Sequence, residues 1–227
     1  MKVEIIKPYG YCTGVARAIK LAKKIKEENK DKNVVVLGML VHNNDALNEL
    51  KSYGVKTLYK KGVSYIDLVD KLNKDDYVIL TAHGHDKRIE TKLDKLGIKY
   101  FDATCPFVEV AHEMIRKEIN AKHEVLYIGK RNHPEAIAAI SLGKKVHLYD
   151  INDWFDFSIL KDGSPLIINQ TTFSKEEVKD HEKIIKAHFP LARIANTVCN
   201  ASSMRQQALL NFSKDVDAIY EIGRAHV

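Results

Sequence analysis

The sequence predicts an α/β protein built from a repeat of about 93 residues, whose third copy is incomplete. The three cysteines are evenly spaced, with 93 residues from Cys12 to Cys105 and 94 from Cys105 to Cys199. Each cysteine follows a β-type segment and opens an amphipathic stretch with helical spacing. Each amphipathic stretch is followed by a further β-rich run that ends in small residues. Strands and helices that alternate at a fixed period are typical of parallel sheets assembled from similar units.

The helices that follow the cysteines are recognised from apolar residues at helical spacing. These residues are Val15, Ile19 and Ala22 in the first copy, Val108, Ala111 and Ile115 in the second, and Met204, Ala208 and Leu209 in the third. The β-rich runs that follow them cover residues 33–38, 124–129 and 217–223. We also expect a strand at the N-terminus, around Lys2 and Glu4. Small or capping residues stand at each junction, and Pro106 suits a first helical turn, so each cysteine is predicted at a helix N-terminus.

The cysteines are interpreted as thiols rather than as a disulfide framework, because their number is odd and no export signal is expected. At a helix N-terminus, exposed amides and the helix dipole stabilise the thiolate form, which binds metals. Three equivalent loops at the carboxyl ends of parallel strands would bring the thiolates to one axis. Three thiolates can hold a zinc ion or three irons of a 4Fe-4S cluster. The absence of a Cys-x-x-Cys knuckle favours the cluster over zinc, and unrelated free thiols stay as an alternative.

Three histidines stand at the ends of β-rich runs, in loops with glycine or asparagine nearby. The segment Val-His-Asn-Asn places His42 30 residues beyond Cys12, and Asn-His-Pro-Glu places His133 28 residues beyond Cys105. His83 stands in Thr-Ala-His-Gly-His. Converging imidazoles can hold an anion such as a diphosphate, although a single histidine is more often an ordinary surface or core residue.

Polar residues near these histidines suggest proton transfer and ligand orientation. Glu135 follows His133 at the start of a helix, where a carboxylate can relay protons beside a metal site or complement the helix dipole. Gln170 and Thr171 follow the strand 166–168, where an amide and a hydroxyl can position a small polar ligand or cap the next helix. At these positions the residues alone leave both alternatives open.

The composition is that of a folded globular protein, with 45% hydrophobic and 29% charged residues. The net charge of +6 suits an anionic partner, but lysines on the exposed face of the helix near Val15 explain much of it. No zinc-finger spacing or RNA-binding aromatic signature occurs, so no nucleic-acid partner is expected. The apolar runs are shorter than the roughly 18 residues of a membrane span, so we expect a cytoplasmic protein with no membrane partner.

Seven motifs occur in one order along the chain. They are Gly-Tyr-Cys-Thr-Gly-Val-Ala-Arg-Ala-Ile, Val-His-Asn-Asn, Ala-His-Gly, Phe-Asp-Ala-Thr-Cys-Pro, His-Pro-Glu, Asn-Gln-Thr-Thr, and Thr-Val-Cys-Asn-Ala with Arg205 and Gln206. In order and approximate spacing the set resembles the LytB/IspH family, the 4-hydroxy-3-methylbut-2-enyl diphosphate reductases. The resemblance covers essentially residues 1–220.

The resemblance implies three α/β domains around a pseudo-threefold axis, with a central 4Fe-4S cluster bound by Cys12, Cys105 and Cys199. It implies an oxidoreductase of isoprenoid biosynthesis that reductively dehydroxylates 4-hydroxy-3-methylbut-2-enyl diphosphate. The products would be isopentenyl and dimethylallyl diphosphate, at the last step of the non-mevalonate pathway. Ferredoxin or flavodoxin would be the electron donor.

The resemblance also implies roles for individual side chains. The diphosphate-binding histidines would be His42, His83 and His133. Glu135 would deliver a proton, and Thr171 and Gln170 would orient the substrate. We therefore expect Glu135 and Thr171 in the catalytic machinery.

The end of the sequence departs from the family pattern. In the family the third domain continues and supplies a Ser-x-Asn loop for the diphosphate, which does not occur here. We interpret the chain as C-terminally truncated and poorly active, and Ile222–Val227 as resembling a translated sequencing adaptor. The expected domains are residues 13–103, residues 104–197, and a partial third domain formed by 1–12 with 198–227.

Two other functions fit the residues less well. One is a noncatalytic phosphate- or RNA-binding α/β module with incidental cysteines, and the other, weaker, is a zinc hydrolase. Bound iron distinguishes the reductase from both.

Overall fold

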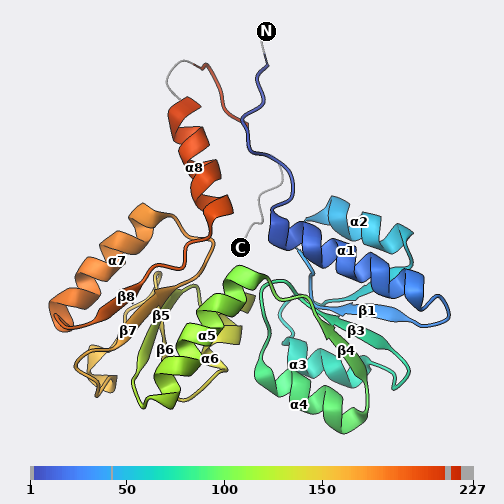
Figure 1. Cartoon of the computed structure of the whole chain (residues 1–227), viewed down its shortest axis with the longest axis horizontal. Helices are drawn as coiled ribbons and strands as arrows, with labels where there is room; N and C mark the ends of the chain where they lie inside the picture. The colour runs from blue at the N-terminus through green and yellow to red at the C-terminus, as the bar shows by residue number, and fades with distance from the viewer. Residues whose placement is uncertain (1–2, 42, 213–215, 221–227) are drawn as a thin grey trace.

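Two four-stranded sheets form the described part of the protein, a computed structural model that describes residues 3–41, 43–212 and 216–220. Figure 1 shows the sheets side by side, each with helices packed on its faces. Every strand pair in both sheets is parallel. Parallel neighbours need crossover connections, and helices supply them here. The predicted α/β class is therefore confirmed.

The first half of the chain forms the first sheet and its helices. In chain order its elements are α1 (Thr13–Glu28), β1 (Val34–Leu37), α2 (Asn44–Ser52), β2 (Val55–Leu58), α3 (Tyr65–Leu68), η1 (Val69–Lys71), β3 (Tyr77–Leu80), α4 (Lys87–Leu96) and β4 (Lys99–Asp102). The strand order is β2-β1-β3-β4.

The second half forms a sheet of the same topology. Its elements are α5 (Pro106–Asn120), β5 (Val125–Gly129), α6 (Pro134–Ile140), β6 (Val146–Asp150), η2 (Phe157–Ile159), β7 (Leu166–Asn169), α7 (Lys175–His188) and β8 (Arg193–Ala195). The strand order β6-β5-β7-β8 repeats that of the first sheet, with β5 in place of β1. Each sheet therefore has a switch point, between β1 and β3 or between β5 and β7, where the chain changes direction across the sheet.

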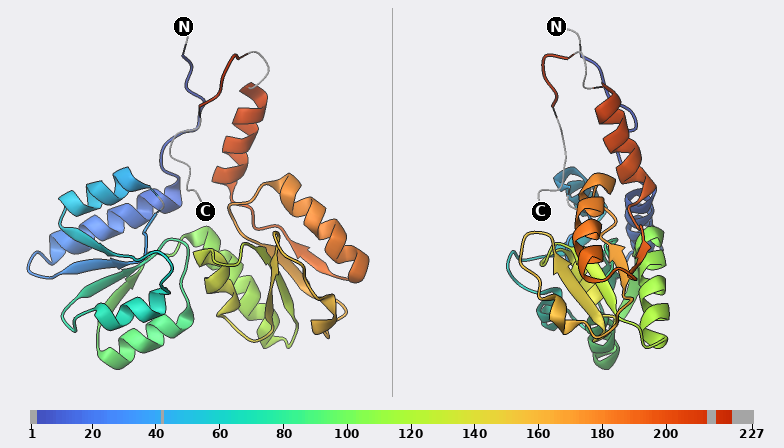
Figure 2. Two further views of the ribbon diagram at one scale, coloured as in Figure 1. Left: turned by 180° about the vertical axis from the view of Figure 1, so that it is seen from behind. Right: turned by 90° about the vertical axis from the view of Figure 1, so that its left-hand side faces the viewer.

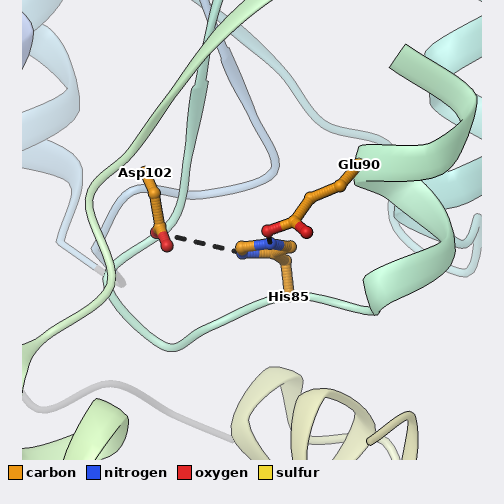
Figure 3. Close-up of side chains that lie close together, drawn as sticks. All are labelled: His85, Glu90 and Asp102. Carbon is orange, nitrogen blue, oxygen red and sulfur yellow. Dashed lines mark hydrogen bonds and ion pairs between the residues drawn. The ribbon is translucent and has the colours of Figure 1, made fainter. Parts of the chain in front are cut away.

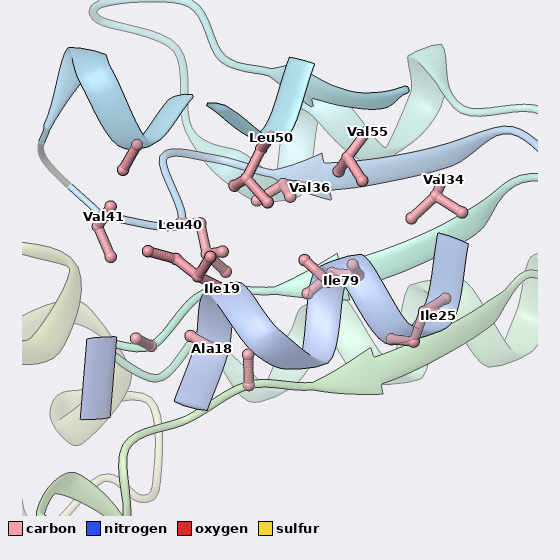
Figure 4. Close-up of a cluster of buried hydrophobic side chains, with 14 residues drawn as sticks. Ala18, Ile19, Ile25, Val34, Val36, Leu40, Val41, Leu50, Val55 and Ile79 are labelled. Atoms are coloured by element: carbon pink, nitrogen blue, oxygen red, sulfur yellow. The ribbon is translucent and has the colours of Figure 1, made fainter. Parts of the chain in front are cut away.

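The central strands are buried on both faces, as parallel strands in α/β proteins usually are. All four residues of β1 are buried, and so are all five of β5. Figure 4 shows the core between the first sheet and helices α1 and α2, in which Ile19 and Leu50 face Val36 and Ile79. A second core covers the opposite face of this sheet with side chains from α4. These cores hold the strand ends in position.

The remaining described segments form no sheet. Helix α8 (Asn200–Phe212) has no buried residue, and it projects beyond the two sheets beside the N-terminal segment (Figure 2). The guanidinium of Arg205 in α8 donates to the carbonyl of Gly10 at 2.6 Å. The strand expected around Glu4 is not formed, because residues 3–12 have no neighbouring strand to pair with. The strand expected at 217–223 is not formed by residues 217–220 either, and residues 221–223 lie outside the described residues. Lys2, expected in the N-terminal strand, also lies outside them.

No helix in the described ranges combines the length and the apolar character needed to cross a bilayer.

We predict that Ile79→Ala lowers the free energy of unfolding by about 2 to 5 kcal/mol, because it leaves a cavity in a core where Ile79 is fully buried. Urea unfolding followed by circular dichroism measures this loss. Ile5→Ala is the matched control, since Ile5 is 69% exposed and its truncation should change stability by less than about 0.5 kcal/mol. Equal losses for the two variants would contradict the packing described above.

Candidate functional site

Each of the three cysteines lies at a helix N-terminus, as the sequence predicts. Cys12 is the N-cap of α1, Cys105 is the N-cap of α5, and Cys199 directly precedes α8. The amide of Val15 donates to the Cys12 sulfur at 3.5 Å, and the amide of Ser202 donates to the Cys199 sulfur at 3.4 Å. All three thiols are free and half-buried. The helix starts therefore present sulfur atoms, as the junction residues predict.

Two of the cysteines are held by equivalent hydrogen bonds to strand ends. The Cys105 amide donates to the carbonyl of Ala82 at 2.9 Å, just beyond β3. The Cys199 amide donates to the carbonyl of Thr171, also at 2.9 Å, just beyond β7. Because β3 and β7 occupy the same place in their sheets, the repeat in sequence becomes a repeat in geometry.

The sulfur atoms converge around Gly14. A Cβ added to Gly14 would lie 2.5 Å from the Cys105 sulfur and 3.9 Å from the Cys12 sulfur, so only glycine fits there. The guanidinium of Arg17, one turn along α1, donates to the carbonyl of Thr104 at 2.9 Å and binds this helix to the Cys105 loop. Cys12 and Cys105 are thus brought together from helices far apart in sequence, and Cys199 is near enough for its charge to act on Cys105.

The pKa of the Cys105 thiol is raised, which differs from the expected stabilisation of thiolate. Burial is the main cause, and the neighbouring charges of Cys12 and Cys199 add to it. The amides of Phe107 and Val108 lower the pKa, but by less. The amides at the helix N-terminus are therefore not sufficient to stabilise the Cys105 thiolate, and a bound cationic group would supply that stabilisation.

The three cysteine sulfurs do not form a preformed zinc site in the described part of the chain. Zinc–sulfur bonds of about 2.3 Å place tetrahedral sulfurs about 3.8 Å apart. The three cysteine sulfurs do not form a group within 4.8 Å, although all three lie in the part of the chain that the structure describes. The donors present are three cysteine sulfurs, and cysteine ligands suit iron–sulfur clusters.

Glu135 is the most deeply buried carboxyl group near the cysteines, with 2% of its surface exposed. Its Oε1 accepts hydrogen bonds from the Thr171 amide at 2.7 Å and from the Tyr127 hydroxyl at 3.0 Å. Its Oε2 lies 3.1 Å from the Thr171 hydroxyl. Since the Thr171 carbonyl also holds Cys199, one residue connects the carboxyl group to a cysteine loop. Glu135 and Thr171, which are each expected in the catalytic machinery, are therefore in direct contact.

Burial raises the pKa of Glu135 to about 7. The hydrogen bonds from Thr171 and Tyr127 favour the ionised form but do not compensate for the loss of water. A carboxyl group with such a pKa can exchange a proton near neutral pH.

His133 lies beside Glu135, and His83 lies beside His133. His133 is the N-cap of α6, and its Nδ1 accepts from the Glu135 amide at 3.2 Å. The rings of His83 and His133 are perpendicular with centroids 5.8 Å apart, so loops from the two sheets meet here. His42 lies outside the described residues, directly before Asn43, the N-cap of α2. Each of these loops follows a strand beside a switch point, where open α/β sheets bind ligands.

The side chain of Gln170 connects two loops. Its Oε1 accepts from the Lys130 amide at 3.3 Å, and its Nε2 donates to the Thr172 hydroxyl at 2.9 Å. Only 3% of Gln170 is exposed. In this conformation it supports the loop that carries Thr171.

Two residues that the sequence did not single out belong to this region. Tyr127, in an otherwise apolar strand, is 1% exposed and completes the Glu135 network. His112 packs beneath Gly84, where a Cβ would lie 2.8 Å from its Cε1. Burial lowers the pKa of His112 to about 4, so the ring is neutral. The hydroxyl group of Tyr127 in an otherwise apolar strand could have pointed to a buried polar partner. The position of His112 depends on tertiary packing and has no comparable signal in the sequence.

Comparisons with known proteins agree on one family. A family profile described as LytB protein matches residues 3–227. The 4-hydroxy-3-methylbut-2-enyl diphosphate reductase of Malacoplasma penetrans is 31% identical over 98% of this chain and 77% of its own length. The enzyme of that name from Symbiobacterium thermophilum is 33% identical over 98% of this chain and 76% of its own length.

Two solved structures of diphosphate reductases are also similar to this chain. A structure of (E)-4-hydroxy-3-methyl-but-2-enyl diphosphate reductase, described as the terminal enzyme of the non-mevalonate pathway, matches with a TM-score of 0.72 at 29% identity. The match covers 92% of this chain and 72% of that one. A Plasmodium falciparum reductase matches with a TM-score of 0.78 at 22% identity, over 91% of this chain and 64% of its own, and shares the fold.

The raised pKa of Glu135 predicts a specific pH dependence of stability. Well below pH 4.5 the carboxyl group is protonated in both the folded and unfolded states, so its burial does not lower the free energy of unfolding. As the pH rises from 4.5 to about 7, only the unfolded chain releases the proton, so the free energy of unfolding falls, by about 3 kcal/mol in total. Glu135→Gln, which is neutral throughout, should lack this loss. Urea unfolding across this pH range measures the difference, and identical profiles for wild type and Glu135→Gln would contradict the raised pKa.

Proposed function

The chain belongs to the LytB protein family, and on this basis we propose that it reduces 4-hydroxy-3-methylbut-2-enyl diphosphate to isopentenyl and dimethylallyl diphosphate. The reaction consumes two electrons and two protons and releases the hydroxyl oxygen as water. The observation that carries this proposal is the joining of the Cys199 loop, through Thr171, to a buried carboxyl group with a pKa of about 7.

The cofactor is a 4Fe-4S cluster held by Cys12, Cys105 and Cys199. These three residues would hold the cluster, which would supply electrons and a Lewis acid for the substrate oxygen. The approach of the Cys12 and Cys105 sulfurs to Gly14, together with the effect of the Cys199 charge on the pKa of Cys105, supports this ligand set. Arg17, through its bond to the Thr104 carbonyl, keeps the Cys105 loop against α1.

Glu135 is the proton donor. Its pKa of about 7 leaves much of the population protonated near neutral pH, although the Thr171 amide and the Tyr127 hydroxyl both favour the anion. After it releases a proton, these two donors stabilise the carboxylate that forms. The Thr171 hydroxyl, 3.1 Å from Oε2, can accept the proton and pass it toward the substrate.

The histidines His42, His83 and His133 bind the diphosphate, and Gln170 and Thr171 orient the substrate. Support comes from the perpendicular pair of His83 and His133 and from their loops at the carboxyl ends of β3 and β5. Gln170 contributes by holding the loop after β7 in the conformation that presents Thr171.

The electron donor is a small acidic protein of the ferredoxin or flavodoxin class, which the net charge of +6 would attract. We place the reaction in the cytoplasm, where three unpaired thiols stay reduced. The domains run from 13 to 103 and from 104 to 197, with 1–12 and 198–227 in a third. The identical strand orders of the two sheets support the first two of these boundaries.

The experiment that tests this function compares turnover by wild type and Glu135→Gln. We expect the variant to form the same cluster but to reduce the substrate at least about a hundredfold more slowly, because the amide has no proton to deliver. Glu176→Gln is the matched control, since Glu176 is exposed in the first turn of α7 and should leave the rate unchanged. The assay is anaerobic product formation with a chemical reductant. Turnover by Glu135→Gln equal to the low rate expected of the wild-type chain would exclude Glu135 as the donor, and a wild-type chain that binds no iron–sulfur cluster would exclude the function.

Thr171 should respond to loss of its hydroxyl rather than to loss of volume. Thr171→Val keeps the shape but removes the group that lies 3.1 Å from Glu135 Oε2, and we expect kcat to fall about tenfold or more. Thr171→Ser keeps the hydroxyl and should recover most of the rate. Steady-state kinetics of both variants distinguish the two roles, and equal losses would argue that Thr171 acts only through packing.

A further inference from the structure

A second group of metal-binding residue types contains no cysteine and lies at the carboxyl ends of β3 and β4 (Figure 3). His85 stands in the loop after β3, Glu90 in the first turn of α4, and Asp102 at the end of β4. One possible ligand atom from each of the three lies within 4.8 Å of the others. None of them takes part in the proposed reaction.

His85 has a buried nitrogen atom that no hydrogen bond satisfies. Its side chain is 5% exposed, and its Nε2 lies 2.7 Å from Glu90 Oε1. Its Nδ1 is fully buried and has no hydrogen-bond partner among the described residues. Figure 3 shows this nitrogen facing Asp102, whose Oδ1 is 4.0 Å away. That separation is too long for a hydrogen bond. The buried Nδ1, which faces the Asp102 carboxylate while Glu90 contacts Nε2, is therefore available to a ligand.

The group is accessible to a cation from solvent. The side chains of Glu90 and Asp102 are 25% and 42% exposed, so the buried imidazole forms the floor of the group and the carboxylates form its rim. The ammonium of Lys87 already lies 2.8 Å from Glu90 Oε1, which shows that this carboxylate accepts a cation. Lys87 is 40% exposed and can move away into solvent.

We propose that His85, Glu90 and Asp102 bind a divalent transition-metal cation. One imidazole and two carboxylates form a nitrogen and oxygen donor set that suits Mn²⁺, Fe²⁺ or Zn²⁺, and it contains no thiolate. Three protein ligands leave positions for water, as in open metal sites.

The site would be coupled mechanically to the cysteine centre. Asp102 Oδ1 accepts hydrogen bonds from both the amide and the hydroxyl of Thr104, the residue before Cys105. A cation bound to Asp102 would restrain the segment that ends at Cys105. Stiffening of this segment is a structural role, separate from the redox chemistry.

Mn²⁺ is the probe of choice, because thiolates bind it poorly and the cysteines would contribute little. The intact chain is titrated with Mn²⁺ anaerobically, and the EPR signal of free Mn²⁺ reports binding. We expect one ion per chain, and His85→Gln should weaken binding by about tenfold or more. His147→Gln is the matched control, since His147 also pairs with a carboxylate, that of Glu124 at 3.2 Å, but belongs to no three-ligand group in the described residues. It should bind Mn²⁺ as wild type does.

Lys87→Gln provides a test that misfolding cannot imitate. Removing the competing ammonium should strengthen Mn²⁺ binding several-fold, whereas damage to the fold would weaken it. Binding that His85→Gln weakens and Lys87→Gln strengthens supports the site. Absence of binding to the wild-type chain, or binding that His85→Gln leaves unchanged, overturns it. Binding by Lys87→Gln alone also overturns it, because the group would then be an ion-pair network closed by the lysine.

Discussion

Two backbone hydrogen bonds determine the arrangement of the site. The Cys105 and Cys199 amides each donate to a carbonyl just beyond the third strand of a sheet, at Ala82 and Thr171. A capping cysteine is held in place relative to its own helix. The bond from its amide to a strand end then fixes the position of the helix N-terminus relative to the sheet. Because both sheets have the same strand order, the same bond recurs and directs both sulfurs to one side. Gly14 then lets α1 approach the Cys105 sulfur.

Burial decides the chemistry of the groups placed there. It raises the pKa of Glu135 to about 7 in spite of hydrogen bonds from Thr171 and Tyr127, and it raises the pKa of Cys105 in spite of amides at its helix start. Both groups are thus held closer to their protonated forms than in water. For the carboxyl group this favours proton delivery near neutral pH. For the thiol it disfavours thiolate, a form that a bound metal cation would stabilise.

The sequence was sufficient to predict elements that depend on local pattern. The cysteine spacing and apolar periodicity predicted the repeat, the parallel α/β class and helices beginning at Cys12, Cys105 and Cys199. The sequence was not sufficient to predict features that depend on contacts between distant parts of the chain. A strand near Glu4 needs a partner strand that residues 3–12 do not have, and the raised pKa of Cys105 depends on its burial. Pairing of Leu80 with Asp102 in neighbouring strands brings Asp102 to His85, which no short motif could show.

The central claim is that three helix-capping cysteines bind one iron–sulfur cluster next to Glu135. The most direct test is anaerobic reconstitution with iron and sulfide, followed by Mössbauer spectroscopy and metal analysis of wild type and of Cys12→Ser, Cys105→Ser and Cys199→Ser. We predict a single 4Fe-4S cluster per chain in the wild type, and loss of most of the iron in each serine variant because each removes one of three protein ligands. A chain that binds one zinc ion and no iron would contradict the claim. So would iron binding that is unaffected by removal of any one cysteine.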